Sequence, residues 1–232
     1  MSDRLIEILL SSFFKILIPG IKVTLPLTII SFLISLVIGL FLALVQVSEV
    51  KVLKQFSQFY IWIFRGTPLI VQLFIIFFGL PSIGIILDAF PAAVIAFAMN
   101  LGAYNAEVFR SAILSVPKGQ MEAAYMIGLD YPKAMVRVIL PQAFQVAFPS
   151  LFNNLISLLK DTALASSITV IDLFTTAQQI AARTYEPFAL YMEAALIYLI
   201  FSTFLTYLQG YLEKKFVWTT KEDKPGKRKA VL

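Results

Sequence analysis

Long runs of apolar residues, separated by short polar segments, dominate the hydrophobic pattern of this chain. A helix needs roughly 20 residues to cross the hydrocarbon core of a bilayer, which is about 30 Å thick. Five runs reach that length, approximately at Thr24 to Val47, Tyr60 to Leu80, Ala89 to Phe109, Phe148 to Ile168 and Phe188 to Leu212. The pattern therefore predicts an all-α integral membrane protein with five transmembrane helices, whose termini lie on opposite sides of the membrane.

The residues before the first run form a pattern of their own. Their apolar positions recur at helical spacing on one face, at Leu5, Ile8, Leu9, Phe13 and Ile16. Such a one-sided pattern is typical of a helix that lies in the membrane interface, so we expect a short N-terminal interfacial helix. The charged residues among the first ten positions do not fit a cleavable signal peptide.

Small or polar residues recur about every four positions within the first run, at Pro26, Ser31, Ser35 and Gly39. A stripe of this kind lets a second helix approach closely, which is a main source of helix association in lipid. We interpret it as a packing surface rather than a ligand site.

Composition agrees with a membrane protein and excludes several kinds of chemistry. Of 232 residues, 59% are hydrophobic and only 14% are charged, whereas soluble domains are about 25% charged. The chain has no cysteine and no histidine, which excludes disulfides, thiolate or imidazole metal ligands and histidine-dependent catalysis. The basic residues flank the apolar runs, so the basic pI predicts no nucleic-acid partner.

The basic residues also predict the orientation. One side of the membrane would carry Lys51, Lys54, Lys118, Lys133, Arg137 and the C-terminal lysines, and the other only Arg4, Lys15, Lys22 and Arg183. The positive-inside rule places the first set in the cytoplasm and the N-terminus outside. We expect one membrane domain over residues 1–220, with a cytoplasmic loop at about 117–143, and a basic cytoplasmic tail over residues 221–232.

The cytoplasmic loop reads as helix, turn, helix. Its charged residues exclude it from hydrocarbon. Gly128 suits the left-handed conformation that ends a helix, and Asp130 can cap a second short helix with Pro132 in its first turn. We expect Leu140 and Pro141 to close this unit.

The loop resembles the "EAA" loop of ABC-importer permeases, which docks into an ATPase subunit. The resemblance rests on Glu122, Ala123, Ala124, Gly128 and the sequence Val138-Ile139-Leu140-Pro141, with Val138 in place of the usual isoleucine. The alternative is an interfacial helical hairpin without a partner.

A second motif interrupts the second run. Arg65, Gly66, Thr67 and Pro68 predict a break near the cytoplasmic end of that helix, because proline removes a backbone donor and Thr67 can satisfy a freed carbonyl. The stretch is similar to one in permeases for polar amino acids. It is either a gating hinge or a plain kink with an arginine that extends to the interface.

The third run carries a polar stripe. Asn100, Tyr104 and Glu107 recur at i, i+4 and i+7, and Arg110 lies one turn beyond Glu107. Charged groups in a membrane usually face water, a partner or a ligand. The surrounding sequence GAYNAEVFR again resembles the polar amino-acid permeases, so these residues line either a transport pathway or a structural Glu107–Arg110 bridge.

The fourth run repeats this theme. Asn154 and Asp161 share a face with Ser157, and Lys160-Asp161-Thr162-Ala163-Leu164 resembles the family's KDTSL stretch, with alanine replacing the serine. The resemblance makes Asn154, Asp161, Thr162 and Leu164 candidate substrate-binding residues beside those of the third run. A structural Lys160–Asp161 pair is the alternative.

Together these motifs extend from Arg65 to Ala165 and resemble type I ABC importer permeases for polar amino acids. The resemblance implies a prokaryotic plasma-membrane subunit that pairs with a second permease, expected to be an identical copy. It further implies two ATPase subunits, which bind ATP and magnesium, and an external amino-acid-binding protein. The chain has no GxxxxGK[ST] loop, so we expect no cofactor or metal on it and no catalytic residue.

Two questions stay open on the sequence alone. Two acids, Glu107 and Asp161, favour a basic amino acid as substrate, although Arg110 and Lys160 can cancel them. The rival functions are an ATP-independent channel and an intramembrane enzyme with a Ser-Lys dyad, formed by Lys160 with Ser157 or Ser166.

Overall fold

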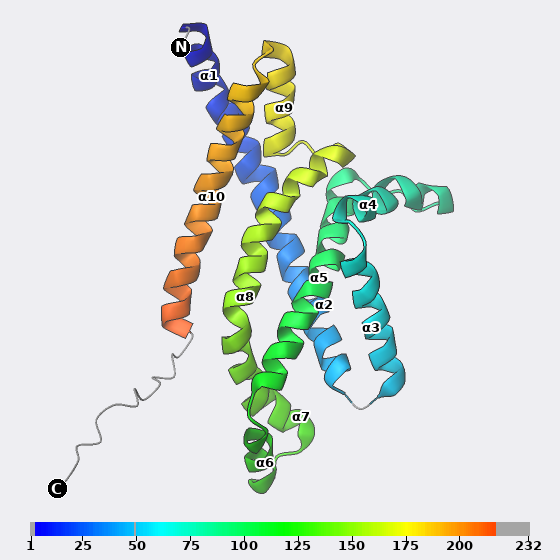
Figure 1. Ribbon diagram of the computed structural model, residues 1–232. Helices are drawn as coiled ribbons and strands as arrows, with labels where there is room; N and C mark the ends of the chain where they lie inside the picture. Colours follow the sequence, from blue (N-terminus) through cyan, green and yellow to red (C-terminus); the bar gives the residue numbers. More distant parts are fainter. Residues whose placement is uncertain (1–2, 49, 217–232) are drawn as a thin grey trace, which may run out of the picture.

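The protein is built from helices, with no strand among the residues that its structure, a computed structural model, describes. These are residues 3–48 and 50–216, and the predicted basic tail lies outside them. Figure 1 shows the arrangement of the α-helices, which are α1 (Asp3–Pro19), α2 (Leu25–Val47), α3 (Lys51–Gly66), α4 (Leu69–Phe74), α5 (Ala89–Ser115), α6 (Lys118–Met126), α7 (Tyr131–Ala134), α8 (Leu140–Asp161), α9 (Leu173–Thr184) and α10 (Pro187–Phe216).

The membrane-spanning segments agree with the predicted five. Four continuous helices are long and apolar enough to cross a bilayer, at Arg4–Val47, Ala89–Ser115, Tyr131–Ile168 and Pro187–Lys215. The fifth is a bent pair, Lys51–Gly66 with Leu69–Ile83, whose two parts meet at 104°. The all-α membrane fold is therefore confirmed.

The first spanning helix corrects the prediction of a separate interfacial helix. α1 continues into α2 without a break, because a π-helical turn over Gly20–Thr24 accommodates the proline and glycine at this point. The resulting 44-residue helix is about 66 Å long, twice the thickness of the hydrocarbon core. Its apolar face packs on α9 and α10 around the fully buried Ile16, so protein rather than the interface covers that face.

The second predicted span corrects another expectation. The break between Gly66 and Leu69 exists, but it follows the 16 residues of α3, about 24 Å along the helix axis from the start of α3. It therefore lies well inside the molecule and not near the beginning of the span. Figure 1 shows α4 leaving α3 sideways at this point.

The packing stripe on α2 is confirmed. Ser31, Ser35 and Gly39 are buried, and α2 lies against α5. A β-carbon added to Gly39 would lie 2.7 Å from the Cβ of Asn105, closer than real Cβ contacts. On the other side of the contact, a β-carbon on Gly102 would lie 2.7 Å from Cγ2 of Ile38. Small residues on both helices thus allow α2 and α5 to approach each other closely.

The predicted coupling loop is joined to the fourth span more directly than the sequence predicts. α7 continues through a π-helical turn over Met135–Ile139 into α8, with Pro141 in the first turn of α8. Leu140 and Pro141 therefore do not close the loop, because the π-helical turn directly before Pro141 lets the helix continue past the missing N–H. The loop and α8 form one continuous helix from Tyr131.

The sequence did not predict α9. Asp172 caps this helix by accepting a hydrogen bond from the backbone N–H of Thr175 at 2.8 Å. Burial raises the pKa of the Asp172 carboxyl. α9 packs on α1 and α10 at the end of the molecule opposite α6 and α7 (Figure 1).

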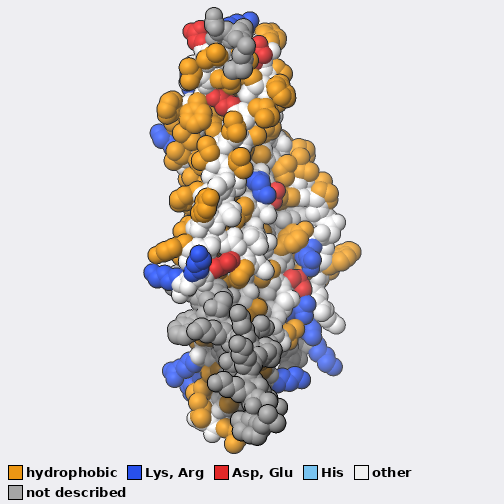
Figure 2. Space-filling view, turned by 60° about the vertical axis from the view of Figure 1, so that its left-hand side comes forward, with side chains coloured by type: hydrophobic (Ala, Val, Ile, Leu, Met, Phe, Trp, Pro, Cys, Tyr) orange, Lys and Arg blue, Asp and Glu red, His pale blue; other side chains and the backbone are white. Residues whose placement is uncertain are grey.

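Charged side chains are distributed unevenly along the long axis of the molecule. On the face in Figure 2, Lys and Arg gather mainly in the lower half, toward the end formed by α6 and α7, while hydrophobic side chains cover the upper half.

Candidate functional site

A polar cleft of about 620 Å³ opens beside the break between α3 and α4; we call it the break cleft. It brings together all four predicted hinge residues and five of the seven predicted substrate-binding residues. Its lining is Arg65, Gly66, Thr67, Pro68, Leu69, Asn100, Leu101, Tyr104, Asn154, Ser157, Asp161 and Leu164. The break, α5 and α8 thus contribute to one site, although about 100 residues separate them in the sequence.

Side chains satisfy the carbonyl groups that the break frees. The Thr67 hydroxyl donates to the Ile63 carbonyl at 2.8 Å, as the sequence predicts. The Phe64 carbonyl accepts from the amides of Gln72 and Asn100, at 3.0 and 3.1 Å. The Asn100 amide also donates to Oε1 of Gln72 at 3.0 Å. These bonds lock the break in place, and they commit the Asn100 amide nitrogen to it.

Sequence reasoning missed Gln72, which is only 5% exposed. Its signal was a single amide in the apolar run LIVQLF, directly after the break. A polar side chain within such a run needs a partner, and the nearest unmatched groups are the carbonyls that the proline frees.

The break cleft holds one cationic and one anionic side chain. The Arg65 guanidinium lies over the ring of Tyr104, 5.3 Å from the ring centre. Asp161 enters from α8 and is exposed. Among the described residues the ion pairs are Arg110–Glu107 and Lys133–Asp130, so the alternative Lys160–Asp161 pair is not formed. Both charges are available to a ligand.

A hydrogen-bonded chain of side chains lies behind the cleft. Nδ2 of Asn154 donates to Oδ1 of Asn105 at 2.8 Å, and Nδ2 of Asn105 donates to the Ser35 hydroxyl at 2.9 Å. Ser35 donates in turn to the Phe32 carbonyl at 2.7 Å. This series of hydrogen bonds links α8, α5 and α2. Sequence reasoning missed Asn105, which is fully buried and lies off the predicted polar stripe of α5.

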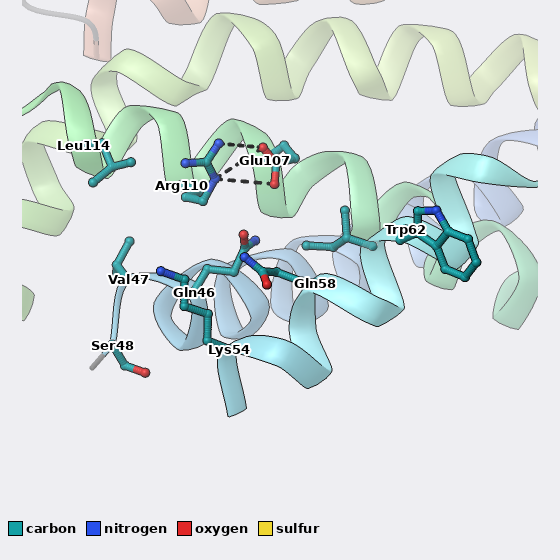
Figure 3. Close-up of a pocket in the computed structure, with 10 residues that line it drawn as sticks. Gln46, Val47, Ser48, Lys54, Gln58, Trp62, Glu107, Arg110 and Leu114 are labelled. Carbon is teal, nitrogen blue, oxygen red and sulfur yellow. Dashed lines mark hydrogen bonds and ion pairs between the residues drawn. The ribbon is translucent and has the colours of Figure 1, made fainter. Parts of the chain in front are cut away.

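Two predicted substrate-binding residues lie outside the break cleft. Thr162 is fully buried, and its hydroxyl donates to the Leu159 carbonyl at 2.7 Å. Glu107 lies farther along α5 and forms the predicted pair with Arg110, with 2.9 Å between Nη2 and Oε2. This pair lines a second cleft of about 590 Å³ between α2, α3 and α5, which we call the Arg110 cleft (Figure 3).

The segment of α6 and α7 has the predicted helix-turn-helix form. Gly128 adopts a left-handed conformation with φ of +82°. The Asp130 side chain accepts a hydrogen bond from the backbone N–H of Lys133 at 3.1 Å and an ion pair from its ammonium at 2.9 Å. The hydrogen bond from the Lys133 side chain lowers the pKa of the Asp130 carboxyl.

The predicted coupling residues are mostly at the surface of this segment. Glu122, Ala123, Gly128 and Pro141 are exposed and Leu140 is half-buried, whereas Ala124 is buried. Large apolar side chains stand exposed at its tip, with Met126 at 88% and Ile127 at 76%. An exposed apolar tip that is held in shape by caps and a glycine turn is typical of a docking element.

Comparisons with known proteins agree on one family. Residues 35–218 match the profile of the family described as "Binding-protein-dependent transport system inner membrane component". The chain is 49% identical over 210 residues to the L-cystine transport system permease protein TcyB of Bacillus subtilis (strain 168), which covers 90% of each chain. It is 43% identical to the putative glutamine transport system permease protein GlnP of Rickettsia typhi, over 87% of this chain and 93% of the relative.

A solved structure gives the same result. The structure described as "Crystal structure of an amino acid ABC transporter with histidines" is 38% identical and has a TM-score of 0.81. The match covers 89% of this chain and 96% of that one. A further relative, the arginine transport system permease protein ArtQ of Bacillus subtilis (strain 168), is 38% identical over 86% of this chain and 91% of its own.

Proposed function

This chain belongs to the family of binding-protein-dependent transport system inner membrane components, and from that membership we propose that its break cleft receives the amino acid that an ATP-driven importer carries. The chain is an amino-acid ABC transporter permease with the type I importer fold. It is a multi-pass inner-membrane subunit and not an enzyme, and in such systems partner ATPase subunits hydrolyse ATP. Neither the channel nor the Ser-Lys enzyme is therefore retained.

The charges in the break cleft support an amino acid as the ligand. A zwitterion needs an anionic partner for its ammonium group and donors for its carboxylate, and Asp161 and Arg65 provide one of each. The amide of Asn154 and the phenol of Tyr104 add polar contacts on the α8 and α5 sides. A volume of about 620 Å³ is within the range of small-molecule sites. The single observation that carries the proposal is this unpaired opposite-charge arrangement inside an apolar bundle.

The substrate belongs to the polar amino acids in this proposal. The preference for a basic amino acid required two acids in one site, but Glu107 lines the other cleft and is paired with Arg110. The break cleft therefore offers one carboxylate, which the α-ammonium group of any amino acid uses. Cystine, glutamine and arginine, after which the relatives' transport systems are named, are the compounds to test first.

Coupling to ATP hydrolysis is assigned to the segment of α6 and α7, by way of Glu122, Ala123, Ala124, Gly128, Leu140 and Pro141. Its exposed apolar tip gives an ATPase subunit a surface to bind. Because α7 runs continuously into α8, a displacement of this segment moves the helix that carries Asn154 and Asp161. The complete importer in this proposal holds two permease copies, two ATPase subunits and an external binding protein.

The orientation in the membrane follows the positive-inside rule. The concentration of Lys and Arg toward α6 and α7 in Figure 2 supports a cytoplasmic position for that end. The N-terminus and α9 then lie outside, where a binding protein would deliver the substrate, and the C-terminus lies in the cytoplasm.

The test is recovery of the tagged chain from its native membranes in mild detergent, followed by mass spectrometry and by uptake assays after reconstitution. We expect a P-loop ATPase in equal amount to this chain, and ATP-dependent uptake of one of the three amino acids. Glu122→Lys should lose the ATPase, whereas Asp88→Lys, at an exposed acid near the opposite end of α5, should keep it. A stable complex without any ATPase would refute the coupling, and uptake of none of the three amino acids would refute the proposed substrate range.

A further inference from the structure

The Arg110 cleft has no role in the transport site as described so far. It lies between the end of α2, the Lys54–Trp62 part of α3 and the second half of α5. Figure 3 shows Gln46, Lys54 and Gln58 on the α2 and α3 side, across from the Glu107–Arg110 pair on α5. These polar side chains line a cleft that Trp62 and Leu114 border with large, exposed apolar side chains.

Gln46 provides the first sign of a missing ligand. Its side chain is 7% exposed and lies near the Glu107 carboxylate, but its amide nitrogen forms no hydrogen bond of normal geometry among the described residues. A buried donor without a partner is destabilising and rare in native proteins. Because this side chain lines the cleft, a hydrogen-bond acceptor that enters the cleft would satisfy it.

The charges provide the second sign. Lys54 and Arg110 contribute two positive charges, and Glu107, which binds Arg110, contributes one negative charge. The cleft therefore has a net charge of about one positive unit and a surplus of donors. A carboxylate is the ligand group that complements an ammonium and two amides, while Glu107 offers an acceptor to an adjacent ammonium group. Donors and acceptor together match a zwitterion better than an isolated anion.

The position of the cleft provides the third sign. Tyr104 lines the break cleft and Glu107, three residues later on the same helix, lines the Arg110 cleft. On α3, Arg65 lines the break cleft and Trp62, three residues earlier, lines the Arg110 cleft. From the break cleft, the Arg110 cleft extends along α5 and α3 toward the end that α6 and α7 form.

We propose that the Arg110 cleft is a second binding site for the transported amino acid, on the exit side, where Lys54 and Gln46 receive the α-carboxylate and Glu107 the ammonium group. This site rests on the proposed function, since it takes its ligand from the break cleft. The Arg110 cleft carries a net positive charge, in contrast to a site lined by acidic residues. It offers the carboxylate a second cation, Lys54, about 16 Å along α3 from Arg65.

The test uses the absence of cysteine in the chain, because a single introduced thiol then reports on one position. Leu114→Cys places the thiol at the rim of the Arg110 cleft without removing a polar group, and Gln55→Cys, exposed on α3 outside this lining, is the control. The complex isolated from its native membranes is treated with a thiol reagent, with and without the amino acid that the uptake assay identifies.

We expect the amino acid to slow labelling of Leu114→Cys at least about fivefold and to leave Gln55→Cys unchanged. Lys54→Gln and Gln46→Leu should abolish this protection. Lys51→Gln, at an exposed lysine one turn earlier on α3, should retain it. Unprotected Leu114→Cys in a complex whose break cleft is protected, as reported by Ser157→Cys, would overturn the second site and leave the proposed function intact.

A lipid or free anion in the cleft gives a different result. The same labelling is run in phosphatidylcholine nanodiscs with and without phosphatidylglycerol, and with inorganic phosphate in place of the amino acid. Protection by the amino acid in both kinds of nanodisc supports the proposal. Protection by phosphatidylglycerol alone would make the cleft a headgroup site, and protection by phosphate but not by the amino acid would make it an unspecific anion site; both overturn the proposal.

Discussion

Three asparagines show how differently one side-chain type is used within this apolar bundle. Asn100 holds the helix break, Asn105 joins α2 to α8, and Asn154 both binds Asn105 and lines the break cleft. Each amide has a partner, which a polar group among apolar helices requires. Asp161 differs, because it has no ion-pair partner among the described residues.

Asp161→Asn removes this negative charge while keeping nearly the same shape. We expect kcat/KM for uptake to fall at least tenfold, which corresponds to about 1.4 kcal/mol, because the ammonium group of the substrate loses its counter-charge. The measurement is initial uptake into proteoliposomes that contain the complete complex. Asp88→Asn, at an exposed acid away from the cleft, is the matched control, and equal uptake by both variants would contradict the assignment.

The sequence predicts part of this site, and helix geometry explains the rest. The i, i+4 rule correctly placed Asn100 and Tyr104 on one face, and Asn154 and Asp161 joined them. Glu107 lies about 10.5 Å along the axis from Asn100, which takes it out of the cleft. Thr162 is the residue after Asp161, about 100° around the helix, and so it points into the core. Asn105 could not be assigned, because its partners Ser35 and Asn154 belong to other helices, whereas Gln72 had a local signal as the single amide directly after the break.

At the scale of single elements, two helices continue where the sequence predicts an end, at Gly20 and at Pro141. The break at Pro68 lies farther along its span than the sequence predicts. Residues Pro19, Gly20 and Pro141 are breakers by propensity, but π-helical turns accommodate them. Pro68 does break its helix, because Thr67, Gln72 and Asn100 replace the lost bonds. Propensity thus locates strained positions, and tertiary partners decide the outcome.

Gly39→Ala tests the contact between α2 and α5. The added β-carbon would meet the Asn105 side chain at 2.7 Å and the backbone nitrogen of Ala106 at 3.0 Å, so the helices must move apart. We expect a loss of about 1–3 kcal/mol in stability, measured as a lower unfolding temperature in detergent. Gly210→Ala, where no atom lies within 4 Å of the new β-carbon, should be neutral or slightly stabilising. An unchanged unfolding temperature for Gly39→Ala would contradict the close approach.

Gly128→Val tests the turn between α6 and α7. A β-branched residue is strained at φ of +82°, although space is available, so the turn should change shape. ATP hydrolysis by the complex should continue while ATP-dependent uptake is lost, because the displaced segment no longer moves α8. Gly119→Val, also without neighbours but at ordinary helical φ, is the control. Normal coupled uptake by Gly128→Val would refute the lever.

At the scale of the whole molecule, one flank of α5 carries both clefts. α3 lines both of them, whereas α8 lines only the break cleft. The five apolar runs predicted this bundle because length and hydropathy alone identify spanning helices. They did not predict α9, which is short and polar for a membrane protein, nor the length of the first helix. Those features depend on α1, α9 and α10 packing together around Ile16.

The orientation is tested on the same cysteine-free chain. Met126→Cys at the tip of α6 and Tyr185→Cys after α9 place exposed thiols at opposite ends of the molecule. In intact cells an impermeant thiol reagent should label Tyr185→Cys alone, and after lysis it should label both. Labelling of Met126→Cys in intact cells would reverse the assigned topology.

The most direct test of the break cleft as the transport site is substrate protection of Ser157→Cys. Ser157 is exposed and lines the cleft beside Asp161, and Gln179→Cys, exposed on α9, is the control. In the isolated complex, the transported amino acid should slow labelling of Ser157→Cys in the concentration range that half-saturates uptake, and Asp161→Asn should remove the effect. Labelling of Ser157→Cys at the same rate with and without substrate, in a complex that still transports, would contradict the account.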